Sequence, residues 1–204
     1  VLARELSAAE IAEVKKEADC ELEVFALGAL CVSFSGQCLA SLTWGGRSAN
    51  RGQCAQPCRL PFRWAAVPHG QKLDFSRGQV KLSSPSHLLS PCDLAGFNKI
   101  DELIRANVSS LKIEGRLKAA SYVYMAVKTM REWVDAHFDK QGRQITPNAA
   151  QILELRRNLS DLNVTFSRGI TPGFLTSVNH QTFIQKGYPK HRGQLLGVVA
   201  EKSN

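Results

Sequence analysis

A buried strand is indicated by the run Leu22-Glu23-Val24-Phe25-Ala26-Leu27, which alternates between polar and apolar residues and then becomes wholly apolar. Ahead of it, Ser7 and Glu10 have the spacing of a capping box, which predicts a helix that ends near Asp19. A short extended run up to Ala3 precedes this helix. The order is therefore strand, helix, strand, as in a βαβ unit.

A similar unit recurs after residue 96. Apolar residues at helical spacing predict a helix over residues 97–107, followed by the strand Ser110-Leu111-Lys112-Ile113. A further helix begins near Ser121, and Tyr122, Ala126, Met130 and Trp133 form its apolar face. Repeated βα units imply a parallel sheet or a barrel. We therefore expect an α/β fold.

The C-terminal third has a different pattern. Thr146 followed by Pro147 predicts a helix to about Asn158, because proline is favoured at the first helical position. The apolar residues within 193–199 resemble the first strand of a further β module. We expect two parts: residues 1–140 with the βα units and a long loop at about 31–63, and residues 141–204 with a helical extension and the beginning of the β module.

The composition is that of a globular protein with one or two folded units: 204 residues, 44% hydrophobic and 22% charged. The longest apolar run, Val24 to Val32, is much shorter than the roughly 20 residues that cross a bilayer. The start, Val1-Leu2-Ala3, has neither an initiator methionine nor a signal-peptide layout, so we expect further sequence upstream.

The formal net charge of +8 favours a polyanionic partner such as RNA, although solubility alone also explains a basic chain. The six cysteines are too sparse for a small secreted disulfide scaffold, and their clustering suits metal binding in a reducing compartment. We therefore expect a cytoplasmic protein.

Four of the cysteines lie in or at the edge of the long loop, at Cys31, Cys38, Cys54 and Cys58. Structural zinc sites usually have two short C-x₂₋₄-C pairs, whereas this order is C-x₆-C-x₁₅-C-x₃-C. A loop that wraps an iron–sulfur cluster accepts such irregular spacing. Iron–sulfur and zinc both stay open, as do disulfides or unligated thiols. Cys92 is a reserve ligand or a small buried residue.

The same loop is basic and aromatic. In proteins that bind RNA, arginines contact the backbone phosphates and interleaved aromatic rings stack on unpaired bases. A solvated basic loop with its aromatic rings in the core is the alternative. The residues are Arg47, Arg51, Arg59 and Arg63 with Trp44, Phe62 and Trp64.

A second candidate site follows the later strand, at Lys112, Glu114 and Arg116. Barrel enzymes keep their chemistry at the carboxyl ends of strands. Glu114 would orient a substrate, and the two cations would hold a phosphate or carboxylate. The alternative is a buried Glu114–Arg116 salt bridge that fixes the turn. Glu23 allows the same two interpretations.

Several segments resemble, in order, those of the collagenase-like peptidase family (peptidase U32 type). They cover nearly the whole chain: Glu23-Val24-Phe25-Ala26-Leu27-Gly28-Ala29-Leu30-Cys31, Ser33-Phe34-Ser35-Gly36-Gln37-Cys38, Asn50-Arg51-Gly52-Gln53-Cys54-Ala55-Gln56-Pro57-Cys58-Arg59, Ser110-Leu111-Lys112-Ile113-Glu114-Gly115-Arg116, Arg168-Gly169 and Pro172-Gly173-Phe174-Leu175.

This resemblance implies a TIM-like barrel of which this chain holds the C-terminal half. It also implies a [4Fe–4S] cluster with Cys31, Cys38 and Cys54 as ligands and Cys58 as the fourth, with Cys92 as the fallback. The sequence of residues 45–50 is similar to that of the family branch that hydroxylates a cytidine of 23S ribosomal RNA. The expected partner is therefore RNA, either rRNA or tRNA.

Two other functions stay open. The family name suggests a peptidase, which needs a nucleophile with a base or a metal-bound water. The sequence contains neither H-E-x-x-H nor G-x-S-x-G, so a peptidase here would use a cysteine thiol. The third function is a non-catalytic RNA-binding scaffold with structural zinc.

Overall fold

The computed structural model describes residues 1–67, 69–70, 82–177, 183–184, 189–193 and 196–200. The chain divides into two compact units. The first unit contains residues 1–30, 92–179 and 190–204, and the second contains residues 31–91 and 180–189. The division at residue 140 stays a prediction.

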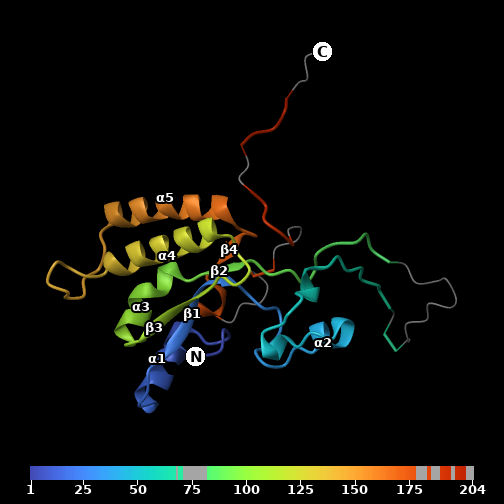
Figure 1. Cartoon of the computed structure of the whole chain (residues 1–204), viewed down its shortest axis with the longest axis horizontal. Coiled ribbons are helices and arrows are strands. Elements are labelled where there is room, and N and C mark those ends of the chain that lie inside the picture. Colours follow the sequence, from blue (N-terminus) through green and yellow to red (C-terminus); the bar gives the residue numbers. More distant parts are fainter. Residues whose placement is uncertain (68, 71–81, 178–182, 185–188, 194–195, 201–204) are drawn as a thin grey trace. The chain divides into compact units, whose positions relative to one another are not determined.

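The first unit is built on a four-stranded sheet in the order β3-β1-β2-β4 (Figure 1). The strands are β1 (Glu23–Ala29), β2 (Asp93–Ala95), β3 (Ser110–Glu114) and β4 (Ile170–Thr171). β1 is parallel to β3 and β2 is parallel to β4, whereas β1 and β2 are antiparallel.

The α/β class is confirmed, but a wholly parallel sheet is wrong at β2. A parallel connection needs a crossover, usually a helix. Here the residues between β1 and β2 form the second unit instead. Within the described residues the sheet is open and does not close into a barrel.

Two capping boxes fix the starts of helices in the first unit. The predicted box holds at α1 (Ala8–Glu17), where the Glu10 amide donates to Ser7 Oγ and the Ser7 amide donates to the Glu10 carboxylate. A second box joins Asn148 and Gln151 at α5 (Ala149–Thr165). The predicted helix start at Pro147 is therefore two residues early, because Asn148 is the N-cap.

The core of the first unit lies between the sheet and the helices α3 (Ile100–Arg105), α4 (Ala120–Asp135) and α5. α4 and α5 run side by side (Figure 1). The predicted apolar face of α4 is confirmed as its buried face. The core residues are Ala26, Leu27, Ala95, Phe97, Ile100, Tyr122, Ala126, Met130, Trp133, Leu155 and Leu162.

The described residues of the second unit have little regular structure, as the sequence predicted for the loop at about 31–63. It contains the short helix α2 (Ala40–Gly45) and 3₁₀ turns at Ala49–Arg51 and Pro57–Arg59. Isolated bridges join Phe62 to Ser86 and Ala65 to Leu82.

Near the C-terminus, residue 193 and residues 196–200 form no strand, and residues 194–195 lie outside the described residues. The β module therefore stays a prediction.

Further 3₁₀ turns lie at Phe97–Lys99 and Gly173–Leu175. Across the described parts of the chain, no helix is long and apolar enough to span a membrane.

Candidate functional site

The four predicted ligands Cys31, Cys38, Cys54 and Cys58 all belong to the second unit, where each is partly buried and outside any disulfide. Burial raises the pKa of the Cys58 thiol, and the charges of Cys31, Cys54 and Cys38 raise it further. Because Coulomb interactions weaken with distance, Cys31, Cys38 and Cys54 each lie within electrostatic reach of Cys58.

Electrostatic reach is longer than a metal–ligand bond. In the part of the chain that the structure describes, no three His, Cys, Asp or Glu side chains are gathered closely enough to hold a metal ion. These two observations are compatible: three thiols lie within electrostatic reach of Cys58, but the four do not form a closed metal cage.

The Cys54–Cys58 pair is shaped by a tight turn. Gln56 has a left-handed backbone with φ of 56°, and Pro57 begins the 3₁₀ turn that carries Cys58. The Gln56 amide donates to Cys54 Sγ over 3.3 Å. Backbone N–H groups directed at sulfur orient and tune metal-bound thiolates. The turn therefore fits a metal or cluster ligand pair.

Two hydrogen bonds join the segments that carry Cys38 and Cys54. Ser41 Oγ, on a side chain only 1% exposed, accepts from the Ala55 amide over 2.9 Å. Asn50 Nδ2 donates to the Gly36 carbonyl over 2.8 Å. Sequence reasoning missed Ser41, because nothing in its neighbours predicts a bond to a residue 14 positions later.

Four cysteine sulfurs, one of which accepts a backbone N–H, fit an iron–sulfur cluster by their donor chemistry. The same donors fit zinc. Cys92, the reserve ligand, is 1% exposed and belongs to the first unit.

Arg59 differs from the other arginines of the loop because it is buried, with 8% of its surface exposed. Its Nη1 donates to Ser90 Oγ over 2.7 Å and to the Pro91 carbonyl. His87 Nδ1 donates to the Arg59 carbonyl over 3.1 Å. Arg59, which directly follows Cys58, is therefore bonded to Ser90 and Pro91.

The other predicted RNA contacts are on the surface. Arg47, Arg51 and Arg63 are exposed, and Trp44 is 63% exposed. The centroid of the Trp44 ring lies 6.4 Å from the centroid of the Phe62 ring. Exposed cations beside an exposed indole suit contact with RNA, and this role stays a prediction.

In the first unit, the strand-end residues are held in ion pairs. Lys112 Nζ lies 2.5 Å from the Glu23 carboxylate, and this hydrogen bond is the largest cause of the lowered Glu23 pKa. Glu114 pairs with Arg4 over 2.8 Å, so the alternative salt bridge to Arg116 is not formed. Arg116 is exposed just beyond the strand.

The guanidinium of Arg4 also lies over the Phe25 ring, 3.9 Å from its centroid. Lys112 and Glu114 are two residues apart on β3 and therefore share a face of the sheet. Their roles with a substrate stay a prediction.

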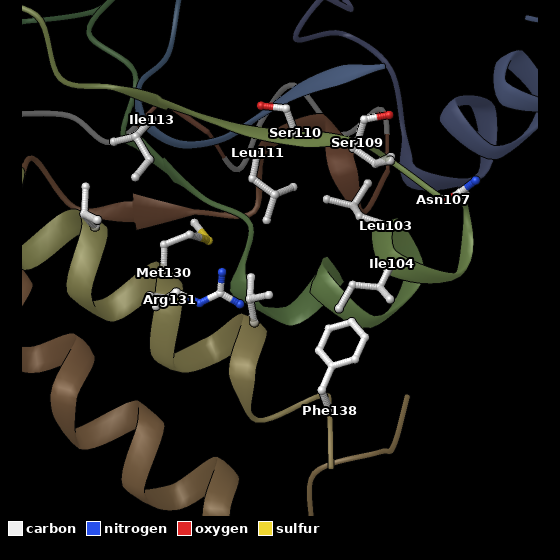
Figure 2. Close-up of a pocket in the computed structure, with 13 residues that line it drawn as sticks. Leu103, Ile104, Asn107, Ser109, Ser110, Leu111, Ile113, Met130, Arg131 and Phe138 are labelled. Atoms are coloured by element: carbon white, nitrogen blue, oxygen red, sulfur yellow. The ribbon is translucent and has the colours of Figure 1, made fainter. Parts of the chain in front are cut away.

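An apolar groove of about 610 Å³ lies beside the edge strand β3 (Figure 2). Leu111 and Ile113 of β3 line it together with side chains of α3 and α4, such as Leu103 and Met130. Its charged lining residue Arg131 forms an ion pair with Asp135. The groove offers apolar surface and no cluster of catalytic groups.

Comparison with known proteins gives relatives of two kinds. The chain is 37% identical over 177 residues to the 23S rRNA 5-hydroxycytidine C2501 synthase of Escherichia coli. This match covers 87% of this chain and 25% of that protein. It is 36% identical over 175 residues to the tRNA hydroxylation protein P1 of Bacillus subtilis, covering 85% of this chain and 40% of that one. A collagenase of Porphyromonas gingivalis is 36% identical over 116 residues, or 57% of this chain and 26% of that protein.

The chain thus spans less than half the length of these relatives. No solved structure matches it significantly. The family model described as peptidase family U32 matches residues 1–185. With nearly the whole sequence matched, this chain belongs to peptidase family U32.

Proposed function

We propose that this chain is part of an RNA-modifying enzyme that hydroxylates a pyrimidine, with a 23S rRNA cytidine as the first candidate substrate and tRNA as the second. An iron–sulfur cluster on Cys31, Cys38, Cys54 and Cys58 would assist the reaction. The observation that carries the proposal is that all four thiols belong to one unit, in which Cys31, Cys54 and Cys38 each raise the pKa of the Cys58 thiol. The relatives named for rRNA and tRNA hydroxylation support the substrate class.

The cluster, when bound, would supply one-electron redox chemistry or a Lewis-acidic iron. The polypeptide would hold the RNA. Arg47, Arg51 and Arg63 are exposed and would contact phosphates, and Trp44, which is 63% exposed, would stack on an unpaired base. Such a substrate implies a cytoplasmic protein.

Lys112, Glu114 and Arg116 would orient a substrate at the carboxyl end of β3. Because Lys112 and Glu114 are already ion-paired, Arg116 is the group of this set most accessible to an anionic substrate.

We also propose that the open sheet is part of a TIM-like barrel in the whole protein. β3 is an edge strand with an apolar groove beside it, and such an edge is normally covered or paired. The relatives are more than twice as long as the matched region, so a protein of their length would have further residues that could pair with β3.

A cysteine peptidase is the second candidate, because one relative is named a collagenase. A thiol nucleophile needs a neighbouring base. His87 is in the same unit as the four thiols, and its Nδ1 proton is used for the Arg59 carbonyl.

One experiment separates these functions. Full-length protein would be expressed in an Escherichia coli strain that lacks its 23S rRNA 5-hydroxycytidine C2501 synthase, and nucleosides from rRNA and tRNA would be measured by mass spectrometry. We expect a hydroxylated pyrimidine with wild type and with Cys20→Ser, but not with Cys38→Ser. Gelatin cleavage without any RNA hydroxylation would favour the peptidase, and zinc without either activity would favour the scaffold.

A further inference from the structure

The burial of Arg59 separates it from the other arginines on the cysteine loop. Arg47, Arg51 and Arg63 are exposed, whereas only 8% of the Arg59 surface is exposed. A guanidinium that contacts RNA phosphates must reach solvent. In this conformation Arg59 therefore cannot act as the surface arginines do.

The contacts of Arg59 are directed into the second unit from both its side chain and its backbone. Nη1 donates to Ser90 Oγ and to the Pro91 carbonyl, and the Arg59 carbonyl accepts from His87 Nδ1. Ser90 is itself only 1% exposed. These bonds attach the residue that follows Cys58 to residues 87–91.

The neighbouring chain continues this attachment. The Phe62 amide donates to the Ser86 carbonyl over 2.7 Å, and the Ser86 amide donates back over 2.9 Å. The Cys54–Cys58 turn is thus followed by a segment bonded at successive points to residues 86–91. Loss of the Arg59 side chain would free the end of this attachment nearest to Cys58.

Desolvating a guanidinium is unfavourable unless hydrogen bonds or opposite charge compensate it. The bonds to Ser90 Oγ and the Pro91 carbonyl therefore help to keep Arg59 buried. Replacing its side chain would remove these bonds from the residue next to Cys58.

We infer that Arg59 is a positioning residue of the cysteine site, which holds Cys58 in place, and is not an RNA contact. The positioning role follows from the hydrogen bonds of Arg59. Only the expected effect on a midpoint potential rests on the proposed iron–sulfur cluster.

The test compares Arg59→Gln, Arg59→Lys and the surface control Arg51→Gln in anaerobically purified full-length protein. Removing a positive charge near a cluster disfavours its reduction, so Arg59→Gln should lower the midpoint potential in a redox titration. Arg59→Lys keeps the charge and should stay close to wild type in potential. Arg51→Gln should weaken RNA binding and leave the potential unchanged.

A second measurement uses protein without metal. Labelling of Cys58 by N-ethylmaleimide, followed by peptide mass spectrometry with the exposed Cys20 as internal reference, should be faster in both Arg59 variants than in Arg51→Gln. If Arg59→Gln does not fold, the labelling rate of Cys58 in Arg59→Lys still tests the inference.

The outcomes separate the two proposals. If wild type holds neither iron nor sulfide, the cluster proposal fails, and faster Cys58 labelling in the Arg59 variants still supports the positioning role. Unchanged labelling and unchanged potential, with RNA affinity reduced as in Arg51→Gln, would overturn the inference and make Arg59 an RNA contact.

Discussion

Arg168 and Asp93 form a buried ion pair that joins β2 to the segment just before β4. The Arg168 amide and Nε each donate to the Asp93 carboxylate over 3.0 Å, and Nη2 donates to it as well. Asp93 is 7% exposed and Arg168 is 3% exposed. The pair spans 75 positions in the sequence and fixes the parallel pairing of β2 and β4.

Removing one partner of this pair should strongly destabilise the first unit, because the other charge is left buried. We expect Asp93→Ala to lose about 3–5 kcal/mol of unfolding free energy, measured by urea denaturation. The control is Asp101→Ala, which removes a more exposed ion pair with Arg105 and should cost less than about 1 kcal/mol. Equal losses in the two variants would show that the Asp93 pair is not structural.

Gly28 is required by the close approach of β1 to β3. It has φ of 112°, and a Cβ there would lie 2.3 Å from the Glu114 carbonyl oxygen. We expect Gly28→Ala to cost more than about 2 kcal/mol, because strain and overlap act together. Gly115→Ala is the matched control, since its nearest new contact is 3.8 Å away. Thermal unfolding of the two variants checks this, and similar melting temperatures would refute it.

Burial and the charge of Asp93 raise the pKa of Tyr122 to about 12, with Arg168 opposing them. An unfolded phenol titrates near 10, so at lower pH Tyr122 is protonated in both states and its contribution to stability is complete. That contribution is lost as the pH rises from about 10 to about 12.

Tyr122→Phe should therefore lose less stability than wild type over this alkaline interval. The measurements are urea denaturation at several pH values and the difference in phenolate absorbance between the two proteins. A difference spectrum with a midpoint near pH 10 would contradict the raised pKa.

The surface arginines of the cysteine loop should contribute to RNA binding through counterion release. Arg47→Gln and Arg51→Gln should each reduce the slope of log K against log salt by about 0.7. Trp44→Ala should weaken binding by about 1–3 kcal/mol through loss of stacking. Arg131→Gln, on α4 and paired with Asp135, is the control and should change neither value. Fluorescence anisotropy with rRNA and tRNA fragments measures both, and a similar effect of Arg131→Gln would refute a localised interface.

Local sequence signals predicted the longer elements well. The capping box at Ser7 and Glu10, the apolar run of β1 and the helical spacing of Tyr122 and Trp133 each depend on near neighbours. β2 and β4 were not predicted, because strands of three and two residues leave no period to detect. Their pairing depends on contacts far apart in the sequence.

The candidate site was predicted by residue type more fully than by arrangement. The loop and its four cysteines were visible in the sequence, and in the structure Cys31, Cys38 and Cys54 each lie within electrostatic reach of Cys58. The partners of Glu114 and Arg59 were not visible, because Arg4 and Ser90 lie 110 and 31 positions away. Burial of Arg59 likewise depends on tertiary contacts that its neighbours in the sequence do not encode.

The most direct test is iron and acid-labile sulfide analysis of the full-length protein, purified without air, as wild type, Cys31→Ser, Cys38→Ser and Cys20→Ser. We expect iron and sulfide in equal amounts in wild type and in Cys20→Ser, and a loss of both in the other two variants while their circular dichroism is retained. Wild-type protein with neither element, or Cys38→Ser protein with a full complement of both, would contradict a cluster at these thiols.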